Sequence, residues 1–261
     1  MAITSTSRRD RRLFLALLVL LPLFGTETPG AETASTTGVT QLGPGVAVDV
    51  SKHEVYLDAT VCMRRGILEY LICAKHTFEH EAVFATEGKA SHLHLGLLLI
   101  GGEPYPYSPA PDWPEQVRQH PAAHLAIIVE FDDQGVLQRR KLSQFARNRE
   151  RADGVVADSW AFAGSVFYER DGKEYYAADS TGGIIGLMYK GASVVQYAEN
   201  IGIPYQGENQ GMEANGDAIP PAGTAVRVIF TRVPAPAPPA PPAPAVVTDQ
   251  PSTIVEQPSG K

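Results

Sequence analysis

The sequence predicts an α+β fold: a single β-rich domain with mainly antiparallel strands and one buried helix near residues 92–100. Three observations lead to this prediction. Short apolar or alternating runs recur along the chain with turn residues between them, which is typical of strands. Two of these runs are joined by Asp171-Gly172, a pair that favours a tight antiparallel hairpin. The stretch His92–Ile100 is apolar nearly all round, as expected of a buried helix.

The first strands are expected at Val46–Val50, Val55–Cys62 and Ile67–Cys73. If Met63–Gly66 forms a tight turn, the second and third strands make a hairpin in which Cys73 lies several residues away from Cys62. A disulfide needs a Cα separation of about 5.5 Å, so both thiols are predicted to be unpaired and mostly buried.

A short strand, Ala82–Thr86, precedes the predicted helix, which Ser91 can cap and Gly101-Gly102 can end. Glu103–Pro121 follows with six prolines and is predicted to be a loop. Loops of this length are uncommon in compact domains, so this segment is a candidate cover for a site.

The second half of the domain is predicted to consist of hairpins and a last strand. His124–Phe131 and Val136–Leu142 form one hairpin, Trp160–Tyr168 and Glu174–Asp179 another, and Thr224–Thr231 is the final strand. Asn200–Gly223 is rich in Gly and Asn and is predicted to be mostly loop.

Composition divides the chain into three parts: a signal peptide at residues 1–31, a domain at 39–233 and a Pro/Ala-rich disordered tail at 234–261. Four arginines precede the 12-residue apolar run Leu13–Phe24, and small residues follow it. This is the pattern of a secretory signal, and the run is short for a membrane span, which needs about 20 residues. The general secretory route is favoured, with twin-arginine export as the alternative. We therefore expect an exported protein, periplasmic or secreted, with no stable membrane anchor after cleavage.

Charge narrows the classes of partner. Without residues 1–30 the chain keeps 18 basic and 27 acidic side chains, a net charge of −9 with neutral histidines. Such a surface repels phosphate backbones, so no nucleic-acid partner is expected. The expected partner is therefore a small ligand or a protein of the cell envelope.

Four of the seven histidines lie between His76 and His94, next to an apolar run. His80, Glu81 and His94 would converge if the Ala82–Thr86 strand packs beside the helix, and imidazole and carboxylate groups suit zinc or another transition metal. The alternative is that these histidines are structural or simply exposed. His76-x-x-Glu79-His80 also matches an inverted zinc-protease pattern, but that mechanism needs the residues on one helix.

Several segments, taken in order, resemble the YdjY domain of secreted bacterial proteins; these are Val61–Glu69, His80-Glu81, His94–Pro104, Trp160–Phe167 and Tyr176–Asp179. The resemblance extends from about Val46 to Thr231. It implies a signal peptide followed by one domain, and it implies no reaction. His80, Glu81 and His94 fall on the family pattern, whereas Tyr105 stands where the family usually has glycine.

These observations favour an exported binding module of uncharacterised function with a His/Glu metal site at His80, Glu81 and His94. One alternative is a metal-dependent hydrolytic enzyme that uses the same residues. Another is a cell-envelope interaction protein that makes its contacts through the Pro-rich tail.

Overall fold

The computed structural model describes residues 38–188, 191–203, 206–207 and 209–233. The predicted signal peptide, residues 1–31, and the predicted tail, residues 234–261, lie outside these described residues. No helix of the described residues is long and apolar enough to span a membrane.

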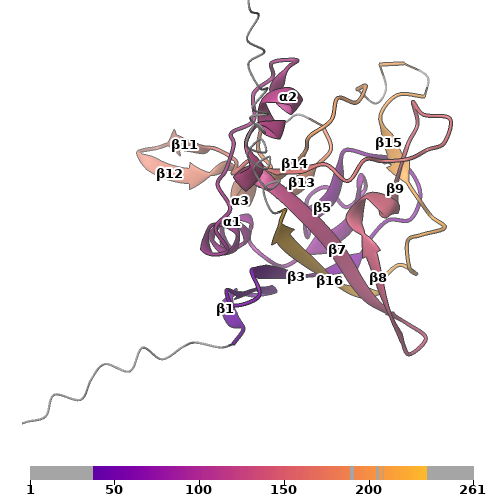
Figure 1. Cartoon of the computed structure of the whole chain (residues 1–261), viewed down its shortest axis with the longest axis horizontal. Coiled ribbons are helices and arrows are strands. Elements are labelled where there is room, and N and C mark those ends of the chain that lie inside the picture. Colours follow the sequence, from indigo (N-terminus) through magenta and orange to yellow (C-terminus); the bar gives the residue numbers. More distant parts are fainter. Residues whose placement is uncertain (1–37, 189–190, 204–205, 208, 234–261) are drawn as a thin grey trace, which may run out of the picture. The chain divides into compact units, whose positions relative to one another are not determined.

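Eight strands form a closed ring in which each is hydrogen-bonded to the next and the last returns to the first (Figure 1). In ring order they are β3 (Glu54–Val61), β16 (Ala225–Arg232), β7 (His124–Asp133), β10 (Trp160–Phe162), β14 (Val195–Tyr197), β13 (Gly183–Gly186), β5 (Tyr70–Ala74) and β6 (Ala82–Thr86). Two of the pairings, β13 with β14 and β5 with β6, are parallel, and the other six are antiparallel.

The remaining strands extend the barrel or lie beside it. β1 (Thr40–Gly43) and β2 (Val46–Asp49) continue the sheet from β3, and β8 (Val136–Lys141) pairs with β7. Two small separate sheets consist of β11 (Phe167–Arg170) with β12 (Lys173–Tyr176), and of β4 (Ile67–Leu68), β15 (Met212–Ala214) and β9 (Ala146–Asn148).

The core fills the barrel interior because alternate residues of each strand point inward. On β3 these are Val55, Leu57, Ala59 and Val61, all buried, while Asp58 between them is exposed. Buried Phe84, Phe145 and Phe230 belong to the same cluster. Closure removes the free edges that an open sheet of these strands would have.

The helices are short: α1 (Ala90–Leu99), α2 (Trp113–Arg118), α3 (Ala177–Thr181) and the 3₁₀ turns η1 (Pro121–Ala123) and η2 (Leu142–Phe145). α2 lies within the predicted Pro-rich loop and anchors it through buried Trp113 and Val117, which cluster with Ala161 of β10 and with Ala198.

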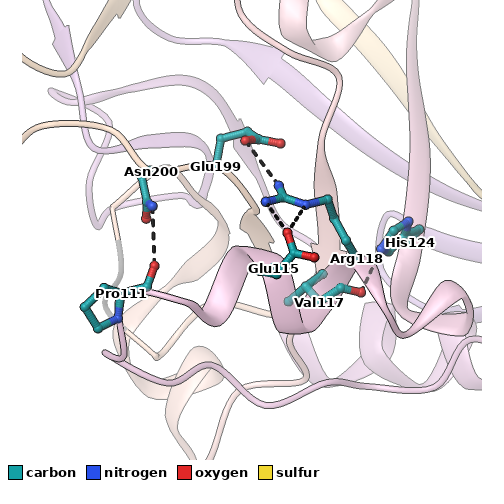
Figure 2. A network of polar contacts seen from close by, with 7 residues as sticks. All are labelled: Pro111, Glu115, Val117, Arg118, His124, Glu199 and Asn200. Atoms are coloured by element: carbon teal, nitrogen blue, oxygen red, sulfur yellow. Dashed lines mark hydrogen bonds and ion pairs between the residues drawn. The ribbon is translucent and has the colours of Figure 1, made fainter.

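Polar contacts hold α2 in place (Figure 2). The Arg118 guanidinium lies 2.8 Å from the Glu115 carboxylate and 3.6 Å from that of Glu199, just after β14. His124 Nε2, at the start of β7, lies 2.9 Å from the Val117 carbonyl oxygen and donates to it. The loop is therefore fixed against the outer face of the barrel.

The predicted α+β class is wrong. About 40% of the described residues lie in strands and about 15% in helices, and the strands close into an eight-stranded barrel. The helix near residues 92–100 is not buried, because Leu95, Leu98 and Leu99 of α1 are exposed. The sequence misled because a helix that is apolar on every side is normally buried, whereas this one buries a single face.

Candidate functional site

α1 is held against the barrel by one face. Ala90, Leu93, Gly96 and Leu97 are its buried residues, and the helix packs on β1, β2 and β3. A Cβ on Gly96 would lie 2.8 Å from Val55 Cγ1, so glycine is required for this close approach. The packing fixes which side chains the helix presents outward.

One of these side chains, His94, is held by groups far away in the sequence. Its Nδ1 lies 3.0 Å from the Gly164 carbonyl oxygen and 2.8 Å from the Tyr176 hydroxyl, and that hydroxyl donates to the same carbonyl oxygen over 2.7 Å. The consistent assignment places a proton on Nδ1, which leaves Nε2 as a hydrogen-bond acceptor. The ring also packs edge-on against Phe162, with centroids 4.9 Å apart.

Burial controls the charge of this group. Desolvation lowers the pKa of His94 below its ordinary value of 6.5, and the hydrogen bond to Gly164 opposes this only in part. Burial likewise raises the pKa of the Tyr176 hydroxyl. At neutral pH the site therefore consists of an uncharged, oriented imidazole beside an uncharged phenol.

The turn that supplies the Gly164 carbonyl has an unusual backbone. Gly164 and Ser165 have φ values of 81° and 55°, in the left-handed region. A Cβ on Gly164 would lie 2.7 Å from Pro104 Cβ and 3.4 Å from His94 Cε1, so no larger residue has room here. Two further bonds tie the turn and α1 to α3: Ala178 N–H donates to Ser165 Oγ, and Ser91 N–H donates to Asp179 Oδ1.

Exposed apolar side chains occur on α1 close to His94 in sequence and on the β11–β12 hairpin, whose Tyr176 contacts His94. Leu95, Leu98 and Leu99 are 46%, 43% and 45% exposed, and Phe167 of β11 is 62% exposed with its ring 5.0 Å from that of Tyr176. We call His94, Leu95, Leu98, Leu99 and Phe167 the α1 surface. It combines exposed apolar area with one oriented hydrogen-bond acceptor.

The other two predicted site residues lie elsewhere. His80 and Glu81 lie in the turns between β5 and β6, where residues 75–81 form no helix, so the zinc-protease pattern lacks the helix that it requires. The His80 side chain is 77% exposed, and its Nε2 is 4.0 Å from Glu81 Oε2.

Within the described ranges, no three His, Cys, Asp or Glu side chains are placed to hold a metal ion. The structure thus brings His80 and Glu81 near each other but does not gather them with His94 into a ligand group. The predicted zinc or transition-metal site gains no support from this geometry.

A cavity of about 750 Å³ is separate from the α1 surface. It lies on the outer face of β3 and β16, and its charged walls are already paired: Arg227 with Asp58 at 3.0 Å and Lys75 with Glu87 at 2.9 Å. Alternating paired charges are typical of a solvated sheet face, so we do not assign a site there.

The sequence could not reveal the partners of His94. Gly164 and Tyr176 are 70 and 82 residues further along the chain. The signal in the sequence that pointed to this surface was the composition of α1, because the helix has more leucines than one buried face can hold.

Fold and site together define a closed β-barrel domain with an apolar surface helix and an oriented histidine. The family model of the YdjY domain matches residues 46–231, so the chain belongs to the YdjY family. The description of that family names no activity. No curated protein and no solved structure matched the chain.

Proposed function

We propose that this chain is an exported binding module that takes up a partner protein through the α1 surface. The partner contributes an apolar face for Leu95, Leu98 and Leu99 and a hydrogen-bond donor for His94 Nε2. Export is supported by the signal-like sequence of residues 1–31 alone.

The observation that carries the proposal is the outer face of α1. Single exposed leucines are common on protein surfaces, but three of them three and four residues apart on one helix share a face, and exposed Phe167 lies against Tyr176, which contacts His94 of the same helix. Such patches mark interaction sites in soluble proteins.

The oriented imidazole adds selectivity. A buried polar group left without a partner costs about 1–3 kcal/mol, so a partner that covers His94 without donating to Nε2 is disfavoured. A partner that donates a hydrogen bond to His94 Nε2 avoids this cost, so the apolar contact stabilises the complex fully.

The two alternatives lack a comparable observation. A hydrolytic enzyme at His80, Glu81 and His94 needs the three groups at one centre, and His94 is already engaged by Gly164 and Tyr176. The Pro-rich tail lies outside the described residues, so no structural observation favours contact through it.

A capture experiment with matched variants tests the proposal. The mature full-length chain is immobilised and exposed to the exported protein fraction of the producing organism, and retained proteins are quantified by mass spectrometry. Leu95→Ser/Leu98→Ser alters the α1 surface, and Val136→Ser/Leu137→Ser is the control, because those side chains are 58% and 64% exposed on the β7–β8 hairpin.

We expect at least one protein to be retained by the wild type and the control but lost with the Leu95→Ser/Leu98→Ser variant. An identical set on all three proteins would contradict the proposal. Retention lost equally in both variants would do the same, because it would show a non-specific hydrophobic effect.

A further inference from the structure

The hairpin of β11 and β12 is a two-stranded sheet of its own (Figure 1). All four residues of β11 are exposed, and on β12 only Tyr176 is buried. Tyr176 anchors β12 to His94 of α1, whereas β11 is held through its pairing with β12 and would gain hydrogen bonds from a strand on its other edge.

One edge of β11 presents unpaired backbone groups. Ala177 N–H donates to the Val166 carbonyl oxygen over 2.8 Å, and with Phe167 opposite Tyr176 this makes Tyr168 and Tyr175 the hydrogen-bonded pair. The N–H and C=O groups of Phe167 and Glu169 therefore point away from β12. No backbone group of the described chain bonds to them.

Natural sheets protect such edges with short strands, charged side chains, proline or bulges, and of these β11 has its short length and the charges of Glu169 and Arg170 at its turn end. β11 has no proline, and its pairing with β12 runs without a bulge from Phe167 to Arg170. Its first half, Phe167 and Tyr168, is aromatic, and Val166 just before it is 51% exposed. This edge is open to another strand.

We propose that two copies of this chain pair through the free edges of β11 to form a symmetric dimer. A two-fold axis relates antiparallel strands, so a strand that pairs with its own copy closes the assembly at two subunits. The result is one four-stranded sheet in the order β12–β11–β11–β12.

Backbone geometry and charge select the register. Outward-pointing residues must face outward-pointing residues, which allows Phe167 opposite Phe167, Glu169 opposite Glu169, or Phe167 opposite Glu169 of the second copy. Placing Glu169 opposite Glu169 brings two like charges together. Placing Phe167 opposite Phe167 pairs only the first residues of the two strands. Placing Phe167 opposite Glu169 uses the outward N–H and C=O groups of both residues in both copies. It gives four N–H···O bonds and puts Tyr168 on the two-fold axis.

Side chains of this register complement one another. The rings of Tyr168 and Tyr175 are stacked within one copy, with centroids 5.6 Å apart and an interplanar angle of 20°. Placing Tyr168 on the axis joins the stacks of both copies into a row of four tyrosines. Arg170, which lies over Tyr175 at 5.4 Å, then faces the apolar Val166 of the second copy and avoids a like charge.

This dimer uses the backbone of Phe167, whereas the proposed partner-binding role uses its side chain and the outer face of α1, so the two can be tested separately. Phe167 and Tyr176 lie directly opposite each other and share the sheet face that meets His94, whereas Tyr168 and Tyr175 lie on the other face. Edge pairing leaves open the face that carries Tyr168 and Tyr175.

Disulfide trapping of the full-length chain tests the register. Residues at a non-hydrogen-bonded antiparallel position lie about 4.5 Å apart at Cα, within the range of a disulfide. We expect Tyr168→Cys to become mainly a reducible covalent dimer under mild oxidation. Arg170→Cys is the control, because residue 170 faces residue 166 of the second copy and lies far from the second residue 170. This variant should remain monomeric on a denaturing gel. The wild type, which has only Cys62 and Cys73, should remain monomeric as well.

Non-covalent association gives a second readout by analytical ultracentrifugation from low micromolar to near-millimolar protein. Glu169→Pro removes an outward N–H from β11, and Glu174→Pro removes the outward N–H at the matching level of β12. We expect about a tenfold weaker dimer for Glu169→Pro, as two lost hydrogen bonds imply, and wild-type association for Glu174→Pro.

A wild type that stays monomeric over this range overturns the dimer, whatever the capture experiment on the α1 surface shows. Equal trapping at positions 168 and 170, or equal effects of the two proline variants, also overturns it. A monomer that binds an extended peptide of another protein at β11 would assign the edge to a different occupant.

Discussion

At the scale of single residues, His94 shows how burial and hydrogen bonding define a chemical state. Desolvation disfavours the imidazolium form, while the Gly164 carbonyl oxygen accepts from the ring in either form, so the balance favours the neutral ring. Tyr176 completes the arrangement by donating to the same carbonyl oxygen. The neutral ring keeps one nitrogen available to a partner.

This state makes stability depend on pH. Because the folded pKa of His94 lies below its ordinary value of 6.5, the unfolded chain binds more protons in that range. The contribution of His94 to stability is present above pH 6.5 and is lost as the pH falls through the folded pKa. We expect His94→Asn, which retains a donor near the Nδ1 position but does not titrate, to lose less stability on acidification.

Urea unfolding of the wild type and His94→Asn, above and below pH 6.5, measures the difference. The other histidines are common to both proteins and cancel in the comparison. Parallel pH profiles for the two proteins would show that His94 does not have the proposed neutral folded state.

The cysteines show how a correct prediction can have an incorrect reason. Cys62 and Cys73 are free thiols, as predicted. The reason is not a hairpin offset: Cys62 N–H donates to the Val83 carbonyl oxygen, and Cys73 lies opposite Ala85, so β6 separates them. Two strand spacings amount to about 9.5 Å, beyond disulfide range.

At the scale of elements, α1 has a packed face and an open face that composition alone does not distinguish. Leu97 is fully buried against the barrel, and Leu98, the next residue, is 43% exposed. We expect Leu97→Ala to lower the free energy of unfolding by about 2–5 kcal/mol and Leu98→Ala by no more than about 0.5 kcal/mol. Chemical denaturation of both variants measures this, and equal losses would mean that the outer face of α1 is covered within the monomer.

Elements with local turn signals were predictable. The hairpin of β7 with β8 and the turn of β11 with β12 formed as expected, because Asp132–Gly135 and Asp171-Gly172 specify them within a few residues. The strands predicted at Trp160–Tyr168 and Glu174–Asp179 are too long, since Trp160–Phe162 is the barrel strand β10 and Ala177–Thr181 is the helix α3. The predicted hairpin across Met63–Gly66 is wrong, since β3 pairs with β2, β6 and β16 and not with β5. Its two strands are both apolar, and periodicity does not say which neighbour each one chooses.

At the scale of the whole molecule, closure is what the sequence did not reveal. Turn chemistry specifies antiparallel neighbours, but the ring also needs the parallel pairs of β5 with β6 and β13 with β14, which have no local signature. A chain read as separate hairpins plus one apolar helix therefore looks like α+β. Of the three predicted site residues, His94 belongs to the proposed α1 surface, and among the described residues His80 and Glu81 are not gathered with it into a ligand group, because His80 and Glu81 lie in the turns between β5 and β6 and His94 lies on α1.

The seam between β3 and β6 is one of three short ladders in the ring, together with those of β7 with β10 and of β13 with β14. Only two residue pairs form this ladder, Thr60 with Ala85 and Val61 with Phe84, compared with seven between β3 and β16. Thr86, 1% exposed, reinforces the seam: its hydroxyl donates to the Asp58 carbonyl oxygen over 2.7 Å and accepts from Gly88 N–H over 2.9 Å.

Thr86→Val keeps the shape of the side chain but leaves the Asp58 carbonyl and the Gly88 N–H without their partner, at a cost of about 1–3 kcal/mol. Because both lost hydrogen bonds lie beside the two-pair ladder of β3 with β6, we expect hydrogen exchange to accelerate first in β6 and in Thr60–Val61, with the β16–β7 ladder retaining its protection. Thr60→Val, on the solvent side of the same seam, is the matched control and should change stability by no more than about 0.5 kcal/mol. Uniform acceleration across all eight strands in Thr86→Val would show that the barrel opens as one unit and that the seam has no separate stability.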